Sequence, residues 1–237
     1  MTTRSTFRVD IQALRALAVL LVVGYHFGLP GFHGGFFGVD VFFVISGYVI
    51  TQVLLREREK SGRTSLPDFY ARRIRRILPA ATVVLVVTVF ATYHYLSFVT
   101  GGVNAVDGEW VALFAGNFHF AQLGTNYFTS RLPPSTLQQY WSLAVEEQFY
   151  LVWPLLLLVI TALSKPKSRS CMLGLVLLAV IVASLTWCII ETRSSPEWAF
   201  FSPLPRAWEL ALGALIAVTE PHFLGRAPRV GRALVVV

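Results

Sequence analysis

The chain has 237 residues, of which 55% are hydrophobic and only 14% are charged, whereas ordinary soluble domains carry roughly 25% charged residues. This composition excludes a soluble globular domain, and it excludes a disordered chain, which would be polar and highly charged. The net charge of +7 comes from basic residues that stand between apolar segments. It therefore indicates the cytoplasmic loops of a membrane protein, not nucleic-acid binding.

Apolar segments long enough to cross a hydrocarbon core of ~30 Å, which takes about 20 residues, recur along the chain. We predict six full spans, at about 14–29, 36–55, 77–99, 143–163, 171–190 and 205–219. The segment 110–123 is shorter and is interrupted by Asn117 and His119, and a last apolar stretch covers 233–237. The sequence therefore predicts an all-α polytopic membrane protein.

The orientation of the spans follows from the basic residues, which concentrate on the cytoplasmic side. Basic loops lie at 56–76, 165–169 and 226–232. The first two must be separated by an even number of crossings, but three apolar segments lie between them. We expect the shortest and most polar, 110–123, to be a re-entrant or half-buried helix beside a cavity. The N-terminus is then cytoplasmic, and the basic stretch 68–76 is expected to lie along the membrane surface.

The first span carries two ionisable residues, Arg15 and His26. Eleven helical steps of 100° leave only about 20° of rotation, so both side chains share one face and lie about 16 Å apart along the axis. Arg15 would be near the cytoplasm and His26 in the outer half. Two interpretations are open. In the first, Arg15 and His26 have structural roles only, with Arg15 extending to the membrane–water interface and His26 forming a hydrogen bond with a neighbour. In the second, they belong to a functional site, as ionisable groups within membrane spans often do.

A second group of ionisable residues is placed in the same outer half by this topology. Glu146 and Glu147 open one span, and Arg206 and Glu209 open another. Because adjacent helical residues point about 100° apart, one of the two neighbouring carboxylates can face a cavity while the other meets a second helix. An interhelical ion network would explain these residues, but a base, acids and a cation in one layer with His26 are also how an acid–base site is assembled.

Four arginines follow the first basic loop in a helical pattern, at Arg72, Arg73, Arg75 and Arg76. The cluster serves either to orient the protein at anionic lipid or to clamp the phosphates of a cytoplasmic ligand, because guanidinium forks match phosphate oxygens. In the second span, Asp40 either pairs with a cation or caps the helix start. Cys171 and Cys188 would lie about 25 Å apart on one helix, too far for a disulfide, and no cluster predicts a metal.

Several motifs, in this order, resemble those of the membrane acyltransferase-3 family of O-acyltransferases. They cover most of residues 7–213 and are Phe7-Arg8-Val9-Asp10 with Leu14-Arg15-Ala16-Leu17, the Arg15/His26 pair, Gly34-Gly35-Phe36 with the run from Gly38 to Tyr48 that contains Asp40 and Ser46-Gly47, Phe69-Tyr70 with Arg72-Arg73-Ile74-Arg75-Arg76-Ile77-Leu78-Pro79, Asn117, Trp141-Ser142-Leu143 with Glu146-Glu147-Gln148-Phe149-Tyr150, and Arg206-Ala207-Trp208-Glu209.

The resemblance implies transfer of an acyl group, usually acetyl, from cytoplasmic acyl-coenzyme A to a hydroxyl of a surface glycan or similar acceptor. Coenzyme A would be a substrate, with no permanently bound cofactor, and the protein would be a multi-pass protein of the plasma membrane. The resemblance suggests His26 as the general base or acyl-handling residue and Arg15 as its partner. Either Glu146 or Glu147 would orient the imidazole, and the four arginines would hold the coenzyme phosphates.

The remaining matched positions, Asp40, Ser46, Trp141, Ser142, Arg206 and Glu209, would bind substrate or support the structure. Family members usually have more spans than this chain, so residues 1–237 are expected to be one partial acyltransferase domain. Two other interpretations stay open: a transporter or flippase-like carrier, because buried charges also suit a substrate path, and an inactive remnant of an acyltransferase.

Overall fold

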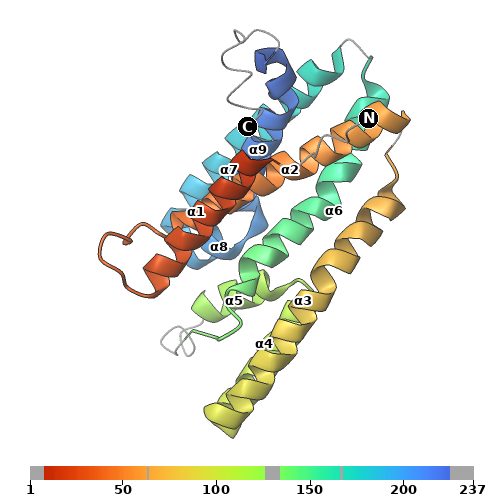
Figure 1. Ribbon diagram of the computed structural model, residues 1–237. Coiled ribbons are helices and arrows are strands. Elements are labelled where there is room, and N and C mark those ends of the chain that lie inside the picture. Colours follow the sequence, from red (N-terminus) through yellow and green to blue (C-terminus); the bar gives the residue numbers. More distant parts are fainter. Residues whose placement is uncertain (1–7, 63, 126–133, 166–167, 225–237) are drawn as a thin grey trace.

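The computed structural model describes residues 8–62, 64–125, 134–165 and 168–224, which form helices and contain no strand (Figure 1). The helices are α1 Val9–His26, α2 Phe37–Ser61, α3 Leu66–Tyr95, α4 Phe98–Ala112, α5 Gly116–Thr125, α6 Tyr140–Leu163, α7 Arg169–Ser194, α8 Pro196–Phe201 and α9 Pro203–Leu224. The basic loop expected at 226–232 and the apolar stretch 233–237 lie outside the described residues, as do Arg63 and Lys167.

Five of the described helices, α1, α2, α3, α6 and α7, are long and apolar enough to cross a membrane. The sixth expected span corresponds to α9, which has 22 residues but carries Arg206, Glu209 and Glu220 and is not among these five. The prediction of an all-α polytopic membrane protein is confirmed.

The basic stretch 68–76 is not a separate segment on the membrane surface, so that expectation is wrong. It forms the first turns of α3, which continues for 30 residues with Pro79 inside it. Ser65 caps the helix by accepting a bond from the Asp68 amide. No helix-ending residue separates the basic turns from the apolar turns, so one helix contains both.

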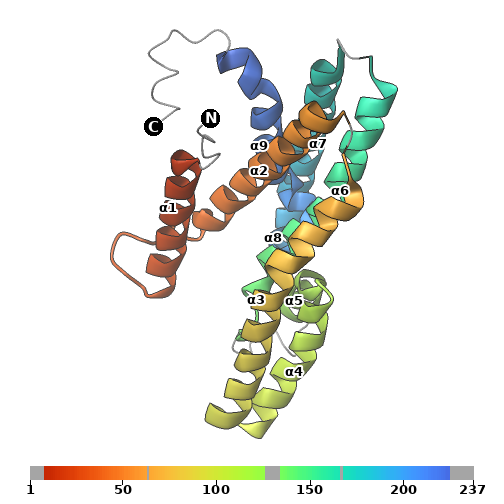
Figure 2. The same cartoon turned by 45° about the vertical axis from the view of Figure 1, so that its right-hand side comes forward.

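Residues 110–123, expected as one half-buried helix, belong to two. Helix α4 ends at Ala112, and α5 begins at Gly116 after a turn in which Phe114 has φ 54°, a left-handed conformation that interrupts a helix. Helix α4 begins at Phe98, where the Ser97 side chain accepts a bond from the Thr100 amide, and it packs back along α3 (Figures 1 and 2). With 15 and 10 residues, both helices are too short to span a bilayer.

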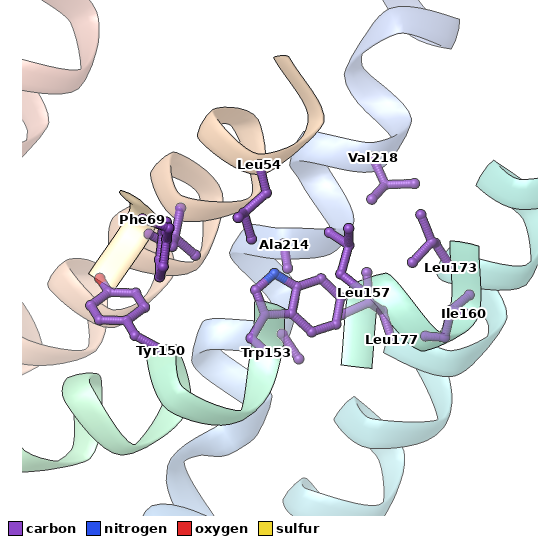
Figure 3. Packing of buried hydrophobic residues seen from close by; sticks show 12 residues of the cluster. Leu54, Phe69, Tyr150, Trp153, Leu157, Ile160, Leu173, Leu177, Ala214 and Val218 are labelled. Carbon is purple, nitrogen blue, oxygen red and sulfur yellow. The ribbon is translucent and has the colours of Figure 1, made fainter. Parts of the chain in front are cut away.

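The larger apolar core joins α2, α3, α6, α7 and α9 (Figure 3). Trp153 lies in the middle of this core and Phe69 at one side of it, next to Tyr150 (Figure 3), and the Trp153 indole donates to Thr51 Oγ1 at 2.8 Å. Helices α2 and α9 pack backbone to backbone, because a Cβ at Gly47 would collide with the Leu210 carbonyl and one at Gly213 with the Val44 carbonyl. Small residues permit such close approach between membrane helices, and here they fix α2 relative to α9.

Helix α1 packs mainly on α2 and stands away from α3 and α6 (Figure 2). The antiparallel contact places Ala18 beside Gly38, where a Cβ on Gly38 would collide with the Ala18 carbonyl. At the other end of α1, Arg8 donates to Tyr48 and Glu220, which ties the start of α1 to α2 and α9. Most large apolar side chains of α1 are exposed.

Candidate active site

A polar cluster joins α2, α3 and α6 at their contact. Ser46 Oγ on α2 donates to Glu146 Oε1 on α6 at 2.6 Å, and Arg73 Nη2 on α3 donates to Glu147 Oε1 at 2.6 Å. The Arg73 guanidinium also lies 3.6 Å from the centre of the Tyr150 ring. We call these five residues the central cluster; it collects two carboxylates, a cation, the Ser46 hydroxyl and the Tyr150 phenol among apolar helices.

The two neighbouring carboxylates diverge, as their helical spacing predicts, and each faces a different helix. Glu146 meets α2 and Glu147 meets α3, and the side chains of Arg73 and Glu147 are 16% and 20% exposed. A cation–carboxylate bond with so little solvent exposure is stronger than a fully exposed one, because water screens the charges less. The cluster is therefore held together by charge but is not sealed from small molecules.

Arg15 on α1 completes the charge pattern around Glu146. Its side chain is partly buried, and its charge acts on the Glu146 carboxylate together with that of Arg73. No hydrogen bond or ion pair engages the Arg15 guanidinium within the described part of the chain. Arg15 is thus a partly buried cation on α1 with its donors free.

A second charged group lies toward the outer ends of α2 and α9. Arg206 Nη1 donates to Asp40 Oδ1 at 3.1 Å and to Glu209 Oε1 at 3.0 Å, so Asp40 pairs with a cation. Trp141 is 6% exposed and packs edge-on against Phe43 beside this group. Among the described residues Glu209 Oε2 is buried and has no hydrogen-bond partner. We call Asp40, Arg206 and Glu209 the outer ion group.

The sequence interpretation that placed His26 in one layer with Glu146, Glu147, Arg206 and Glu209 is wrong for His26. His26 comes eight residues after Ala18 on α1, and Ser46 eight residues after Gly38 on the antiparallel α2. From the Ala18–Gly38 contact these steps lead in opposite directions, about 12 Å each. Glu146, bonded to Ser46, therefore lies on the opposite side of the α1–α2 contact from His26. In the outer ion group, Arg206 bonds Asp40, two residues after Gly38, whereas Glu209 precedes Leu210, whose backbone meets Gly47 beside Ser46.

His26 is exposed at the end of α1, but its imidazole is held in one tautomer. Its Nδ1 lies 2.8 Å from the Val22 carbonyl oxygen, and because a carbonyl only accepts, Nδ1 carries the proton. In the neutral imidazole the lone pair is then on Nε2, the nitrogen farther from its own helix backbone. A neutral imidazole of this form can take up a proton.

The four arginines of the predicted phosphate clamp do not act as one group. Arg73 points into the central cluster, and Arg72 pairs with Glu57 at 2.8 Å. Arg75 bonds only its own helix, at the Ala71 carbonyl, and Arg76 lines a groove of about 430 Å³ between α3 and α6. Arg75 and Arg76 are exposed and have no acidic partner among the described residues, so they are the cations free to bind an anion.

Of the other matched positions, Ser142 bonds only its own helix, through the Gln139 carbonyl. The sequence interpretation missed the pair His119–Asp107, in which the imidazole Nε2 lies 2.8 Å from the carboxylate. The sequence does contain a signal for this pair, because the two ionisable residues lie in or near the short apolar segment 110–123. Both cysteines are free, as their spacing predicts, and the described residues contain no group of three or more side chains suited to a metal.

Comparison with known proteins places the chain in a family. The family described as acyltransferase domain matches residues 8–235, so the chain belongs to the acyltransferase-3 family. It is 37% identical over 215 residues to the peptidoglycan O-acetyltransferase OatA of Listeria monocytogenes, covering 90% of this chain and 34% of OatA.

Two further relatives are similar to the same extent. YrhL of Bacillus subtilis, provisionally named a peptidoglycan O-acetyltransferase, is 35% identical over 89% of this chain and 33% of its own length. A provisionally named O-acetyltransferase of Staphylococcus aureus strain COL is 34% identical over 90% of this chain and 35% of its own. The chain thus spans about one third of these relatives. No solved structure matches the chain.

Proposed function

We propose that this chain is part of the membrane domain of an O-acyltransferase that moves an acyl group, acetyl in the first instance, from acyl-coenzyme A to a hydroxyl of a cell-envelope glycan. Family membership supports acyl transfer, and the names of two relatives favour peptidoglycan as the glycan. The bilayer is then the plasma membrane, with the donor on the cytoplasmic side and the acceptor outside.

The observation that carries the proposal is the distribution of charge along α3. Arg75 and Arg76 are exposed without acidic partners, and Arg73, less than one turn earlier, reaches the carboxylates of the central cluster. Phosphate groups bound at exposed guanidiniums would bring the rest of an anionic donor near buried acid–base groups. Coenzyme A combines phosphates with a thioester, so this arrangement fits it.

At the other end of α1, His26 is the proposed base for the acceptor. Its Nε2 lone pair is exposed, and a base that takes up a hydroxyl proton contributes typically 10²–10⁴ in rate. Arg15 is proposed to act at the central cluster instead, so the two residues of the motif serve opposite ends of the reaction.

The proposal is tested by following acetyl transfer from acetyl-coenzyme A to peptidoglycan fragments, with the protein in nanodiscs. The substitution His26→Gln keeps the size of the side chain and removes its base, so transfer should fall by about 10²–10⁴ while donor binding stays within a few-fold. His94→Gln, an exposed histidine near the end of α3, is the matched control and should transfer like the parent. Equal loss in both variants would refute the role of His26.

Donor binding is tested separately, by titrating coenzyme A. Each charge-assisted bond contributes about 1.5–3 kcal/mol, so Arg75→Gln and Arg76→Gln should each weaken binding by about 10- to 150-fold. Arg193→Gln, an exposed arginine at the end of α7, serves as the control for lost charge. Unchanged affinity in all three variants would leave the cluster with a role in orientation only.

A further inference from the structure

Ser46 has the surroundings of a nucleophile. Its Oγ donates to Glu146 Oε1 at 2.6 Å, within the 2.6–3.2 Å that joins a nucleophile to its base in covalent catalysis. A serine hydroxyl is a weak nucleophile until a neighbouring base removes its proton. Ser46 is also the member of the central cluster whose hydroxyl donates directly to a carboxylate, and it can carry an acyl group as an oxygen ester.

The groups around this pair suit the charge that develops when a hydroxyl attacks a thioester. Arg15 and Arg73 both act on the Glu146 carboxylate. The Arg73 Nε atom is buried and has no hydrogen-bond partner among the described residues, and the Arg15 donors are free. Fixed N–H donors near the reacting atoms stabilise an oxyanion strongly where water is scarce.

The position of Ser46 is fixed by the helix packing around it. Gly47, the next residue, lies against the Leu210 backbone of α9, and Trp153 holds Thr51 one turn later on α2. Ser46 and Glu146 are each only partly buried, so a small acyl group can reach them. Along α2, Ser46 lies six residues, about 9 Å, beyond Asp40 of the outer ion group. It is therefore nearer than Asp40 to the level of Arg73 on α3.

We propose that Ser46 is the nucleophile that takes the acyl group from the donor and holds it as an ester inside the membrane domain. This rests on the proposed acyl-coenzyme A donor and deepens it, because neither the resemblance nor the relatives' names assign a covalent carrier in this chain. A carrier between the two sides of the membrane divides the reaction into a cytoplasmic half and an outer half.

The cytoplasmic half is a simple exchange of bonds. Ser46 Oγ attacks the carbonyl carbon of the thioester while the Glu146 carboxylate takes the hydroxyl proton. The new C–O bond forms, the C–S bond breaks, and coenzyme A leaves as its thiolate. When an acceptor hydroxyl later attacks the ester carbonyl, the new acceptor C–O bond forms and the bond to Ser46 Oγ breaks. Glu146 returns its proton to Ser46 Oγ, and the acceptor's own proton is released to water. No oxidation or reduction occurs, and no other reactant is needed.

The experiment uses the 237-residue chain in nanodiscs with radiolabelled acetyl-coenzyme A and no acceptor. The parent should release a burst of up to one thiol per chain and retain an equal amount of hydroxylamine-sensitive label, which peptide mapping by mass spectrometry should locate at Ser46. Ser46→Ala should lose the burst and the label, whereas Ser194→Ala, an exposed serine at the end of α7, should keep both.

Two further variants keep the test decisive if Ser46→Ala fails to fold. Ser46→Cys retains a nucleophile and should carry the label at the same position as a thioester. Glu146→Gln keeps a hydrogen-bond acceptor but not the base, so its burst should slow by about 10²–10⁴. A label located elsewhere, or a full burst in folded Ser46→Ala, would overturn the proposal.

The two proposals fail in different ways. Thiol release without any ester on Ser46 would overturn the covalent carrier and leave acyl-coenzyme A as the donor. Neither thiol release nor coenzyme A binding in the folded parent chain would overturn the proposed donor and the carrier together.

Discussion

The pair Arg73–Glu147 can be compared with a second arginine–glutamate pair on the same helix. Arg72, the adjacent residue, pairs with Glu57 at 2.8 Å, close to the 2.6 Å of Arg73–Glu147. The Arg72 side chain is 54% exposed, whereas the Arg73 side chain is 16% exposed. Distance and chemistry are thus nearly matched, and exposure differs.

Exposure sets the expected strength of each pair. A double-mutant cycle that replaces Arg72 and Glu57 by glutamine should give a coupling free energy of about 0.2–1 kcal/mol, as exposed pairs do. The same cycle on Arg73 and Glu147 should give about 1.5–3 kcal/mol, because a charge-assisted bond that water reaches poorly is screened less. Single substitution of Arg73 should cost more than this, since Glu147 is then left without its cation.

The assay is equilibrium unfolding in detergent, followed by the fluorescence of the protein's 6 tryptophans, with each cycle measured at low and high salt. The coupling of Arg72 with Glu57 should shrink in high salt because exposed charges are screened, whereas that of Arg73 with Glu147 should change little. Equal coupling energies with the same salt dependence in both cycles would refute the argument from burial.

Two further predictions concern packing and topology. Gly47→Ala should destabilise the protein by about 1–3 kcal/mol or more, because the new methyl group would meet the Leu210 backbone. The control Gly102→Ala in α4 should be neutral or stabilising, because its Cβ would meet only a side-chain oxygen at 3.8 Å. Equal melting temperatures of the two variants would contradict this prediction. The orientation in the membrane is tested with both native cysteines replaced by serine. In that background Leu96→Cys, at the α3–α4 turn, should react with an impermeant thiol reagent from outside, whereas Glu59→Cys, near the end of α2, should react only after permeabilisation. The reverse pattern would show that the protein lies in the membrane the other way round.

Local rules predicted much of the fold from the sequence. The apolar lengths located the five helices long enough to span, because each must satisfy its backbone hydrogen bonds within itself wherever it crosses lipid. The 100° step of a helix predicted that Glu146 and Glu147 point in different directions, one of them toward a cavity; in the structure they do diverge, but both meet another helix, α2 and α3. The same rules failed for residues 110–123, where the left-handed conformation of Phe114 divides the segment into two helices, since neither length nor hydropathy encodes such a turn.

By itself, the sequence determined the class of protein, the helical segments and the polar residues that the apolar helices must accommodate, because hydropathy and helical period act within one segment. Only the tertiary structure decided which of those residues meet. It joined Ser46 with Glu146 and Arg73 with Glu147, and it left His26 on the other side of the α1–α2 contact. Those pairs depend on where the helices touch, which here is set by close backbone approach at glycines such as Gly38 and Gly47. A contact between segments that are distant in the chain leaves no periodic pattern in a single sequence, so sequence reasoning could not find it.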